Sequence, residues 1–347
     1  MSEKKPNIWK RMINNKKSRI IIIILLIIVV ILGCVGGYLT SSKTNNQEDT
    51  VVFIYPKDNF QTLKTQLIEK NIISKNNTSL ETFANLLKYK NNIKPGRYVV
   101  EPHTSILSLV RQLRNRNQTP IKLVILSSRT AEEFAEKISK NLLLNKDDII
   151  KQIKEENYKY TNEIFYYIIP NTYEVYWTIS AEQLLNLLKK ESDKFWQENK
   201  EKLSRTDLTK EEVIRIASIV SEETSKADEM PTIAGVYINR LRKDMLLQAD
   251  PTVKFATGDF SLKRITGKHL QIDSPFNTYK YKGLPPAPIC LPNIQAIQSV
   301  LKYKHHNYLY FCAKEDFSGY HNFASTLEEH QQNGRRYRME LNRRGIK

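Results

Sequence analysis

The sequence predicts an α+β protein that carries one membrane-spanning helix near its N-terminus. Residues 20–39 form an uncharged apolar run of twenty residues, and no second run of comparable length occurs among the 347 residues. Beyond this run, short β-rich segments alternate with segments whose apolar residues recur at helical spacing. Hydrophobic residues make up 40% of the chain and charged residues 26%, which is typical of a protein with packed cores.

The apolar run has the length and the flanks of a membrane anchor. At about 1.5 Å per residue, a helix over these positions spans about 30 Å, the thickness of a bilayer's hydrocarbon core. Seven Lys and Arg residues precede the run within residues 1–19, whereas only Lys43 follows it closely. The positive-inside rule therefore predicts a cytoplasmic N-terminus, with residues 41–347 outside the cytoplasmic (inner) membrane, on its periplasmic face.

A cleaved signal is the competing interpretation of the same run. Residues 31–34 loosely resemble a lipoprotein cleavage box that ends at Cys34, but the bulky Leu32 before the glycine is unfavourable there. We favour an uncleaved single-pass anchor over residues 20–40. Both interpretations place the body of the protein on the far side of the membrane.

The net positive charge of the chain indicates which classes of binding partner it favours. Lys and Arg outnumber Asp and Glu by 54 to 37, which gives a formal net charge of +17. A basic body favours nucleic acid, anionic lipid or an acidic wall polymer. Because the predicted orientation places this body outside the cytoplasm, we expect no nucleic acid partner.

The cysteines predict neither a disulfide framework nor a metal site. Of the three, Cys34 lies in the apolar run, so at most one bridge, Cys290–Cys312, can form in the soluble part. There is no CxxC motif and no His/Cys cluster with ligand spacing, so we expect no metal and no cofactor.

The soluble part divides by pattern into a small module and a larger one. A polar, aperiodic linker over residues 41–50 precedes a strand–helix–helix–strand pattern over residues 51–120. The small module contains no plausible acid/base pair, so we expect it to bind or position. In residues 121–347, the aromatic-rich segment 165–177 suits a packed core or a sugar-stacking cleft, and core is the commoner explanation.

One helix carries a candidate acid. Residues 211–224 read EEVIRIASIVSEET, and Thr209 or Asp207 can cap them. Glu223 lies about 70° from the centre of the apolar stripe on this helix, whereas Glu222 lies about 170° from it. A carboxyl at the edge of an apolar face is in an environment that raises its pKa and suits a general acid. On helix geometry alone, a half-exposed glutamate in a salt bridge is the commoner explanation.

The surrounding motifs resemble the YceG-like endolytic murein transglycosylases (the MltG family). The resemblance covers residues 121–335 in order, and a weaker, LysM-like resemblance covers residues 51–120. The similar segments are Ala217–Thr224, Ile233–Leu241, Leu247–Val253, Ser274–Tyr279, Gly283–Ile289, Tyr308–Phe311 and the tail with Gly319, His321, Phe323, Thr326 and His330. So many linked motifs in one order argue against a chance resemblance.

The resemblance implies a catalytic glutamate at position 223. In the family it is the second glutamate of a Glu-x-Glu-Thr stretch, which here falls on Glu223 followed by Thr224. The sequence departs from the pattern at Ser221, where the family has glutamate, and at Asn171, where it often has aspartate. The first departure leaves open whether Glu222 supplies the missing charge.

The implied activity is that of a lyase, a lytic transglycosylase acting on peptidoglycan. Such an enzyme cuts the MurNAc–GlcNAc bond of nascent glycan strands, leaves 1,6-anhydro-MurNAc ends and is expected to end strand elongation. It needs one placed carboxyl, whereas the usual glycoside hydrolases need two. The expected partners are glycan strands, the cytoplasmic membrane and peptidoglycan synthases.

Candidate substrate-binding residues follow from the charge that develops at C1. The side chains that can stabilise or orient it are Gln248, Asp250, Asn277, Tyr279 and Thr224. For Asp250, which precedes Pro-Thr, a capping role weighs as much as a substrate role. Two other functions stay open: a non-catalytic wall-binding scaffold, and a hydrolase with Asp250 or Glu174 as its second carboxylate.

Overall fold

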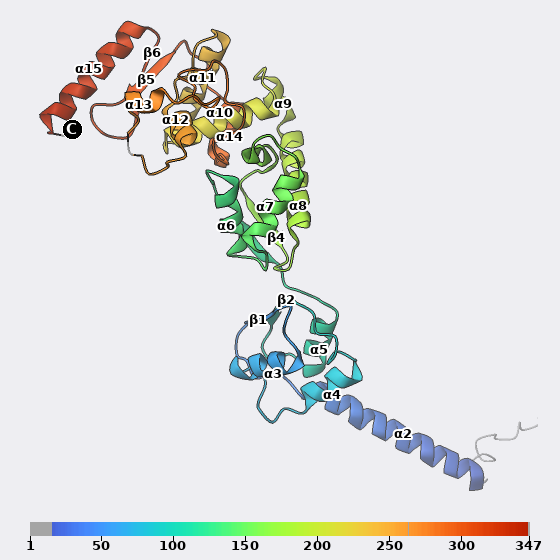
Figure 1. The fold of residues 1–347 in the computed structure, drawn as a ribbon. Helices are drawn as coiled ribbons and strands as arrows, with labels where there is room; N and C mark the ends of the chain where they lie inside the picture. The colour runs from blue at the N-terminus through green and yellow to red at the C-terminus, as the bar shows by residue number, and fades with distance from the viewer. Residues whose placement is uncertain (1–15, 263, 346–347) are drawn as a thin grey trace, which may run out of the picture. The chain divides into compact units, whose positions relative to one another are not determined.

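The structure, a computed structural model, describes residues 16–262 and 264–345 (Figure 1). The described chain forms two compact units: one runs up to Pro120 and includes Tyr176–Thr178, and the other holds residues 121–175 and 179 onward. Most of the predicted cytoplasmic tail (residues 1–19) lies outside the described residues. The mixed α and β content of both units confirms the predicted class.

The apolar run is one helix, α2 (Lys16–Ser41). Within the described part of the chain, it is the single helix long and apolar enough to cross a membrane, and an 18-residue window within residues 16–37 has a mean hydropathy of 3.4. Most of its large apolar side chains are exposed. Because apolar side chains on a helix need apolar surroundings, this surface is suited to lipid.

The first unit pairs two strands and covers them with helices. Strand β1 (Thr50–Ile54) pairs antiparallel with β2 (Gly96–Val100). Between them lie α3 (Phe60–Glu69) and α4 (Ser79–Leu86), and α5 (Ile106–Arg114) follows. This order confirms the predicted strand–helix–helix–strand pattern, while the likeness to LysM stays a prediction.

Part of the segment predicted as a short linker, residues 41–50, forms hydrogen bonds with the first unit. The backbone N–H of Ile106 donates to the carbonyl of Ser42, and the N–H of Thr44 donates to the carbonyl of Thr104. The Asn46 amide donates to the carbonyl of Val100, and the Thr44 and Asn46 side chains are buried. A polar composition is typical of a linker, but here backbone and side-chain groups of residues 42–46 form hydrogen bonds with the small domain that follows.

The second unit begins with β3 (Ile121–Val124), which pairs antiparallel with β4 (Thr172–Val175). Around this pair lie helices α6 (Ala131–Ser139), α7 (Lys146–Glu155), the 3₁₀ helix η1 (Thr161–Tyr167) and α8 (Ala181–Glu198). The aromatic-rich segment is mainly core, as predicted: Phe165 and Tyr173 are buried here. Trp177 is buried in the first unit, against Phe53 and Tyr55.

The rest of the second unit builds the site. Its helices are α9 (Lys200–Ser204), α10 (Lys210–Glu223), α11 (Met230–Arg242), α12 (Asp250–Thr257), α13 (Gly267–Leu270), α14 (Ile294–Leu301) and α15 (Leu327–Arg343). Strands β5 (Tyr310–Ala313) and β6 (His321–Ala324) form an antiparallel pair against which α15 packs. Helices α10, α11 and α14 pack on one another around the main core.

Candidate active site

Helix α10 delivers Glu223 at its last turn. Thr209 caps the helix by accepting a hydrogen bond from the N–H of Glu212, whose carboxylate accepts from the N–H of Thr209 in return. The buried face is wider than the predicted stripe, because Ile214, Ser218 and Ile219 are buried as well. A helix this deeply packed fixes the position of the side chain that it presents at its end.

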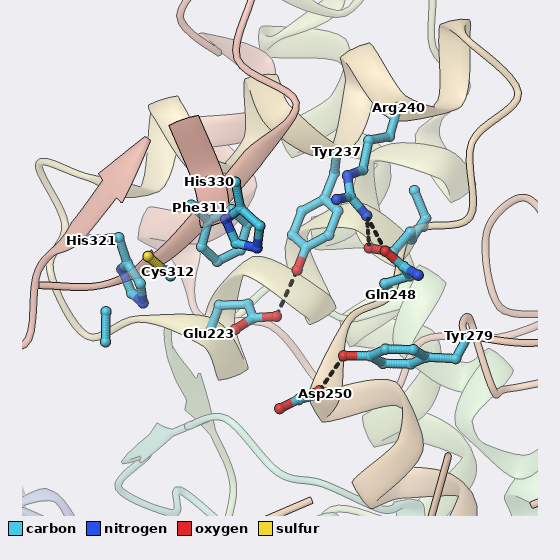
Figure 2. Close-up of a pocket in the computed structure, with 12 residues that line it drawn as sticks. Glu223, Tyr237, Arg240, Gln248, Asp250, Tyr279, Phe311, Cys312, His321 and His330 are labelled. Carbon is cyan, nitrogen blue, oxygen red and sulfur yellow. Dashed lines mark hydrogen bonds between the residues drawn. The ribbon is translucent and has the colours of Figure 1, made fainter. Parts of the chain in front are cut away.

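A pocket of about 300 Å³ lies at the end of this helix (Figure 2). This volume is at the lower end of ordinary ligand sites, which hold about 300–1,000 Å³. The residues that line it come from α10, α11, the segment leading into α12, the turn at 279, β5, β6 and α15. They are Glu223, Tyr237, Arg240, Leu247, Gln248, Asp250, Tyr279, Phe311, Cys312, Ala313, His321 and His330.

The Glu223 carboxyl is held by a buried tyrosine. The Tyr237 hydroxyl donates a hydrogen bond of 2.6 Å to Oε1 of Glu223, and Figure 2 shows the two side chains facing each other. Burial raises the pKa of Glu223 from its ordinary 4.5 to about 7, and the hydrogen bond from Tyr237 opposes this rise. The negative charges of Asp250 and Glu222 raise the pKa further. A carboxyl that titrates near neutral pH is suited to general acid catalysis.

Glu222 lies outside the pocket. It is exposed and pairs with Arg129, with 3.7 Å between the carboxylate and Nε. Glu223, in contrast, makes no ion pair with any described residue within 4 Å, so the salt-bridge explanation fits Glu222 instead. The Ser221 hydroxyl accepts hydrogen bonds from the backbone and side chain of Asn293, where α14 begins. Neither Ser221 nor Glu222 therefore lines the pocket.

Arg240 organises the pocket from α11. Its Nη1 donates to the carbonyls of Leu246 and Leu247, both at 3.0 Å, and to Oε1 of Gln248 at 3.3 Å. Its Nε donates to the carbonyl of Leu309 at 2.6 Å. One buried guanidinium thus fixes both the segment leading into α12 and the segment leading into β5.

Asp250 is paired with Tyr279 across the pocket floor. The Tyr279 hydroxyl donates a hydrogen bond of 2.6 Å to Oδ1 of Asp250. Asp250 is the first residue of α12 and makes no capping bond with its side chain, so the capping role considered for it is not found. Three predicted residues, Gln248, Asp250 and Tyr279, therefore lie in one pocket with Glu223.

Two other predicted residues, Asn277 and Thr224, do not line this pocket. The fully buried Asn277 side chain donates to the carbonyls of Leu270 and Ile272 and accepts from the N–H of Tyr279. Thr224 is buried just after α10. The Asn277 side chain therefore holds backbone beside the pocket, and the Thr224 hydroxyl accepts the N–H of Lys226 at 3.0 Å and lies 3.5 Å from Oε2 of Glu229.

Several pocket residues were not assigned by sequence reasoning. They are Tyr237, Arg240, Phe311, Cys312, His321 and His330. All lie within or beside segments that carry the family resemblance, and Tyr237 and Arg240 share one face of α11 at helical spacing. A tyrosine and an arginine on a buried helix face were the signal available.

The structure also bears on metal, disulfide and second-carboxylate chemistry. Among the described residues, no group of three or more His, Cys, Asp or Glu side chains could hold a metal ion. Cys290 is a buried free thiol and Cys312 is a free thiol in the pocket, so the one bridge considered is not formed. Glu174 is exposed on β4 and does not line the pocket, whereas Asp250 does.

Comparisons with known proteins agree with one another. The profile of the YceG-like family matches residues 52–336. An endolytic murein transglycosylase of Bacillus subtilis is 25% identical over 325 residues, which cover 87% of this chain and 89% of that protein. One of Streptococcus pneumoniae is 27% identical over 328 residues, which cover 83% of this chain and 58% of that protein. A crystal structure of a yceG-like protein from Listeria monocytogenes aligns with a TM-score of 0.51 at 29% identity, covering 83% of this chain and 99% of that one.

Proposed function

The chain belongs to the YceG-like family, and we propose that it is an endolytic peptidoglycan lytic transglycosylase with Glu223 as its acid/base. The observation that carries the proposal is the Glu223 carboxyl, which lines a pocket and accepts a hydrogen bond from the buried Tyr237; burial there raises its pKa to about 7. The names of the Bacillus and Streptococcus relatives supply the substrate, murein.

The reaction can proceed with one carboxyl. The protonated Glu223 donates its proton to the oxygen of the MurNAc–GlcNAc bond while Tyr237 holds Oε1. The C1–O bond breaks, and the C6 hydroxyl of the same muramic acid closes on C1. Glu223, now a carboxylate, can take the proton that this hydroxyl loses, so a second carboxyl is not required. The product is a 1,6-anhydro end, and no water is consumed.

The positive charge that develops at C1 calls for a nearby negative group. We assign this to the Asp250 carboxylate, which Tyr279 orients by its hydrogen bond. Gln248, fixed by Arg240, offers an amide for the sugar. We assign Asn277 and Thr224 a supporting role, because their side chains lie outside the pocket.

Helix α2 supports a site of action at the membrane. We propose that it is an uncleaved anchor in the cytoplasmic membrane, with the N-terminus in the cytoplasm and both units outside. Since residues 42–46 are bonded to the first unit, little free chain follows the anchor. An enzyme held in this way reaches newly made strands first. Ending their elongation next to peptidoglycan synthases follows from that position.

Hydrolysis is the second candidate, and the placement of Asp250 favours it. Two carboxyl groups in one pocket, Glu223 and Asp250, are what a glycoside hydrolase requires. In that reaction water, rather than the C6 hydroxyl, attacks C1.

Digestion in heavy-oxygen water separates the two reactions. The full-length protein in detergent is given linear, uncrosslinked glycan strands, and the new muramic ends are analysed by mass spectrometry. We expect unlabelled ends that are lighter by one water than hydrolysed ends. Label at the new end would replace the proposal with hydrolysis, and intact strands would favour a non-catalytic scaffold.

A further inference from the structure

A buried carboxylate–imidazole pair lies beside the pocket, outside the group of residues that the mechanism uses. Oε2 of Glu229 lies 2.8 Å from Nδ1 of His321, and Oε1 accepts the backbone N–H of His321 at 2.8 Å. The side chains are 5% and 15% exposed. His321 lines the pocket, and Glu229 lies just before α11, so the pair connects β6 to the helices that carry the acid.

The contacts fix which ring nitrogen of His321 carries a proton. A carboxylate only accepts hydrogen bonds, so the nitrogen that faces Glu229, Nδ1, must donate. In the neutral ring, Nε2 then bears a lone pair. Among the described residues, Nε2 has no hydrogen-bond partner. An imidazole oriented by a buried carboxylate, with its other nitrogen free, is the arrangement in which histidine accepts protons during catalysis.

We propose that His321, held by Glu229, takes the proton of the C6 hydroxyl during ring closure, so that Glu223 serves as the acid alone. The inference rests on the proposed function. Glu223 gives its proton to the leaving oxygen as the C1–O bond breaks. The O6–C1 bond forms, and the O6 proton passes to Nε2. Proton exchange with solvent then restores both groups, so atoms balance and no water is consumed.

The other candidates in the pocket are less suited to this step. Asp250 already accepts the hydroxyl of Tyr279, and its charge is needed at C1. His330 stacks on Tyr310 at 5.2 Å, and no residue that the structure describes forms a hydrogen bond with its buried Nδ1 that would fix its tautomer. His321 is the pocket histidine that a carboxylate orients.

Two variants of the full-length protein test the proposal. His321→Gln removes the base, and we expect kcat to fall by about 10²-fold or more with little change in KM. Glu229→Gln keeps the shape, but its single amide oxygen cannot accept from both the backbone N–H and Nδ1 of His321. Its amide nitrogen then faces Nδ1, which moves the ring proton to Nε2 and abolishes the base. We expect a similar loss of kcat.

The matched controls are His305→Gln and Glu222→Gln, an exposed histidine and an exposed glutamate outside the pocket. Nitrogen-15 chemical shifts of the His321 ring report the tautomer directly. We expect Nδ1–H in the wild type and Nε2–H in Glu229→Gln. Thermal unfolding of each variant shows whether its fold is retained.

Three results would overturn the proposal. One is a His321→Gln variant whose kcat equals that of the wild type. Another is a Glu229→Gln variant that is fully active although its ring proton has moved to Nε2. That result would make His321 a hydrogen-bond donor to the sugar. The third is a wild-type His321 ring that carries its proton on Nε2. This result would overturn the proposal even if a variant does not fold. The wild-type product tests the proposed function separately, because anhydro ends would stand whichever group takes the proton.

Discussion

Burial and hydrogen bonding act in opposite directions on the Glu223 carboxyl. Burial favours the neutral acid, and the hydroxyl of Tyr237 favours the carboxylate. The result is a pKa of about 7, which leaves a large share of the molecules protonated at neutral pH. A glutamate at its ordinary pKa of 4.5 would be almost entirely ionised there.

We expect Glu223→Gln to abolish strand cleavage and to retain the fold. Glutamine fills the same space and can accept the hydrogen bond from Tyr237, but it has no proton to give. The loss should be about 10²–10⁴-fold or more, measured as anhydro ends released per enzyme. Glu222→Gln is the control, because Glu222 is exposed and should be dispensable. Equal losses in both variants would show that the acid is misassigned.

We expect Tyr237→Phe to shift the pH profile toward higher pH. Only protonated Glu223 can act, so wild-type kcat/KM should fall as pH rises above about 7. The phenylalanine variant loses the bond that stabilises the carboxylate, so the pKa of Glu223 rises and the falling limb moves up. The measurement is kcat/KM between about pH 5 and 9. A limb that stays in place or moves down would mean that another group limits the wild type.

At the scale of elements, the sequence predicted single helices well and their assembly poorly. The start of α10 followed from a cap at Thr209, one of the two capping residues considered, because capping depends on a few neighbouring residues. The edge position of Glu223 followed from helical periodicity. The pocket, however, joins elements far apart in the chain, and no local pattern indicates that His321 meets α10.

Residues with two plausible roles show the same limit. Asp250 fitted capping and substrate binding equally well by sequence. The structure shows its bond to the Tyr279 hydroxyl and no capping bond, and its substrate role stays a prediction. Asn277 fitted a substrate role, but the structure buries it in a turn. A polar side chain near a motif does not reveal whether it faces the backbone or the ligand.

We expect Gly235→Ala to destabilise the protein although alanine favours helices. A Cβ at this position in α11 would lie 2.5 Å from the carbonyl oxygen of Lys304 and 2.6 Å from Nε2 of His306. The clash is with backbone, so it should cost about 1–3 kcal/mol, more than the roughly 1 kcal/mol that helix propensity returns. Denaturant unfolding of the full-length protein measures the difference.

Gly334→Ala is the matched control in α15. Its Cβ would meet only the Arg338 side chain, at 3.6 Å, which is ordinary contact. We expect it to stabilise the protein by about 0.5–1 kcal/mol. If both variants gained stability equally, α11 would not pack against the segment at Lys304 as closely as described.

At the scale of the whole molecule, the sequence indicated the order of the helical and β-rich segments better than the boundaries of the compact units. An apolar helix, a small unit that runs up to Pro120 and a larger unit follow one another along the chain, and the predicted roles of these parts stay predictions. The boundaries of the first unit do not follow from the sequence pattern, because residues 42–46 are bonded to this unit and Tyr176–Thr178 belongs to it as well. Segments of polar or aromatic residues can complete a neighbouring domain, which composition alone does not show.

The orientation of the anchor decides whether the pocket can meet glycan strands at all. Positive charges before α2 should hold the N-terminus in the cytoplasm, so a reporter fused after Lys347 should be active only outside the cytoplasmic membrane. Cys34→Ala should leave membrane attachment unchanged, because the apolar length of α2 retains the protein without lipidation. Fractionation of cells expressing each form makes both measurements. Release of the Cys34→Ala protein, or its accumulation as a longer precursor, would favour a lipoprotein. A reporter active in the cytoplasm would separate Glu223 from every peptidoglycan strand, and the proposed function would then have to be abandoned.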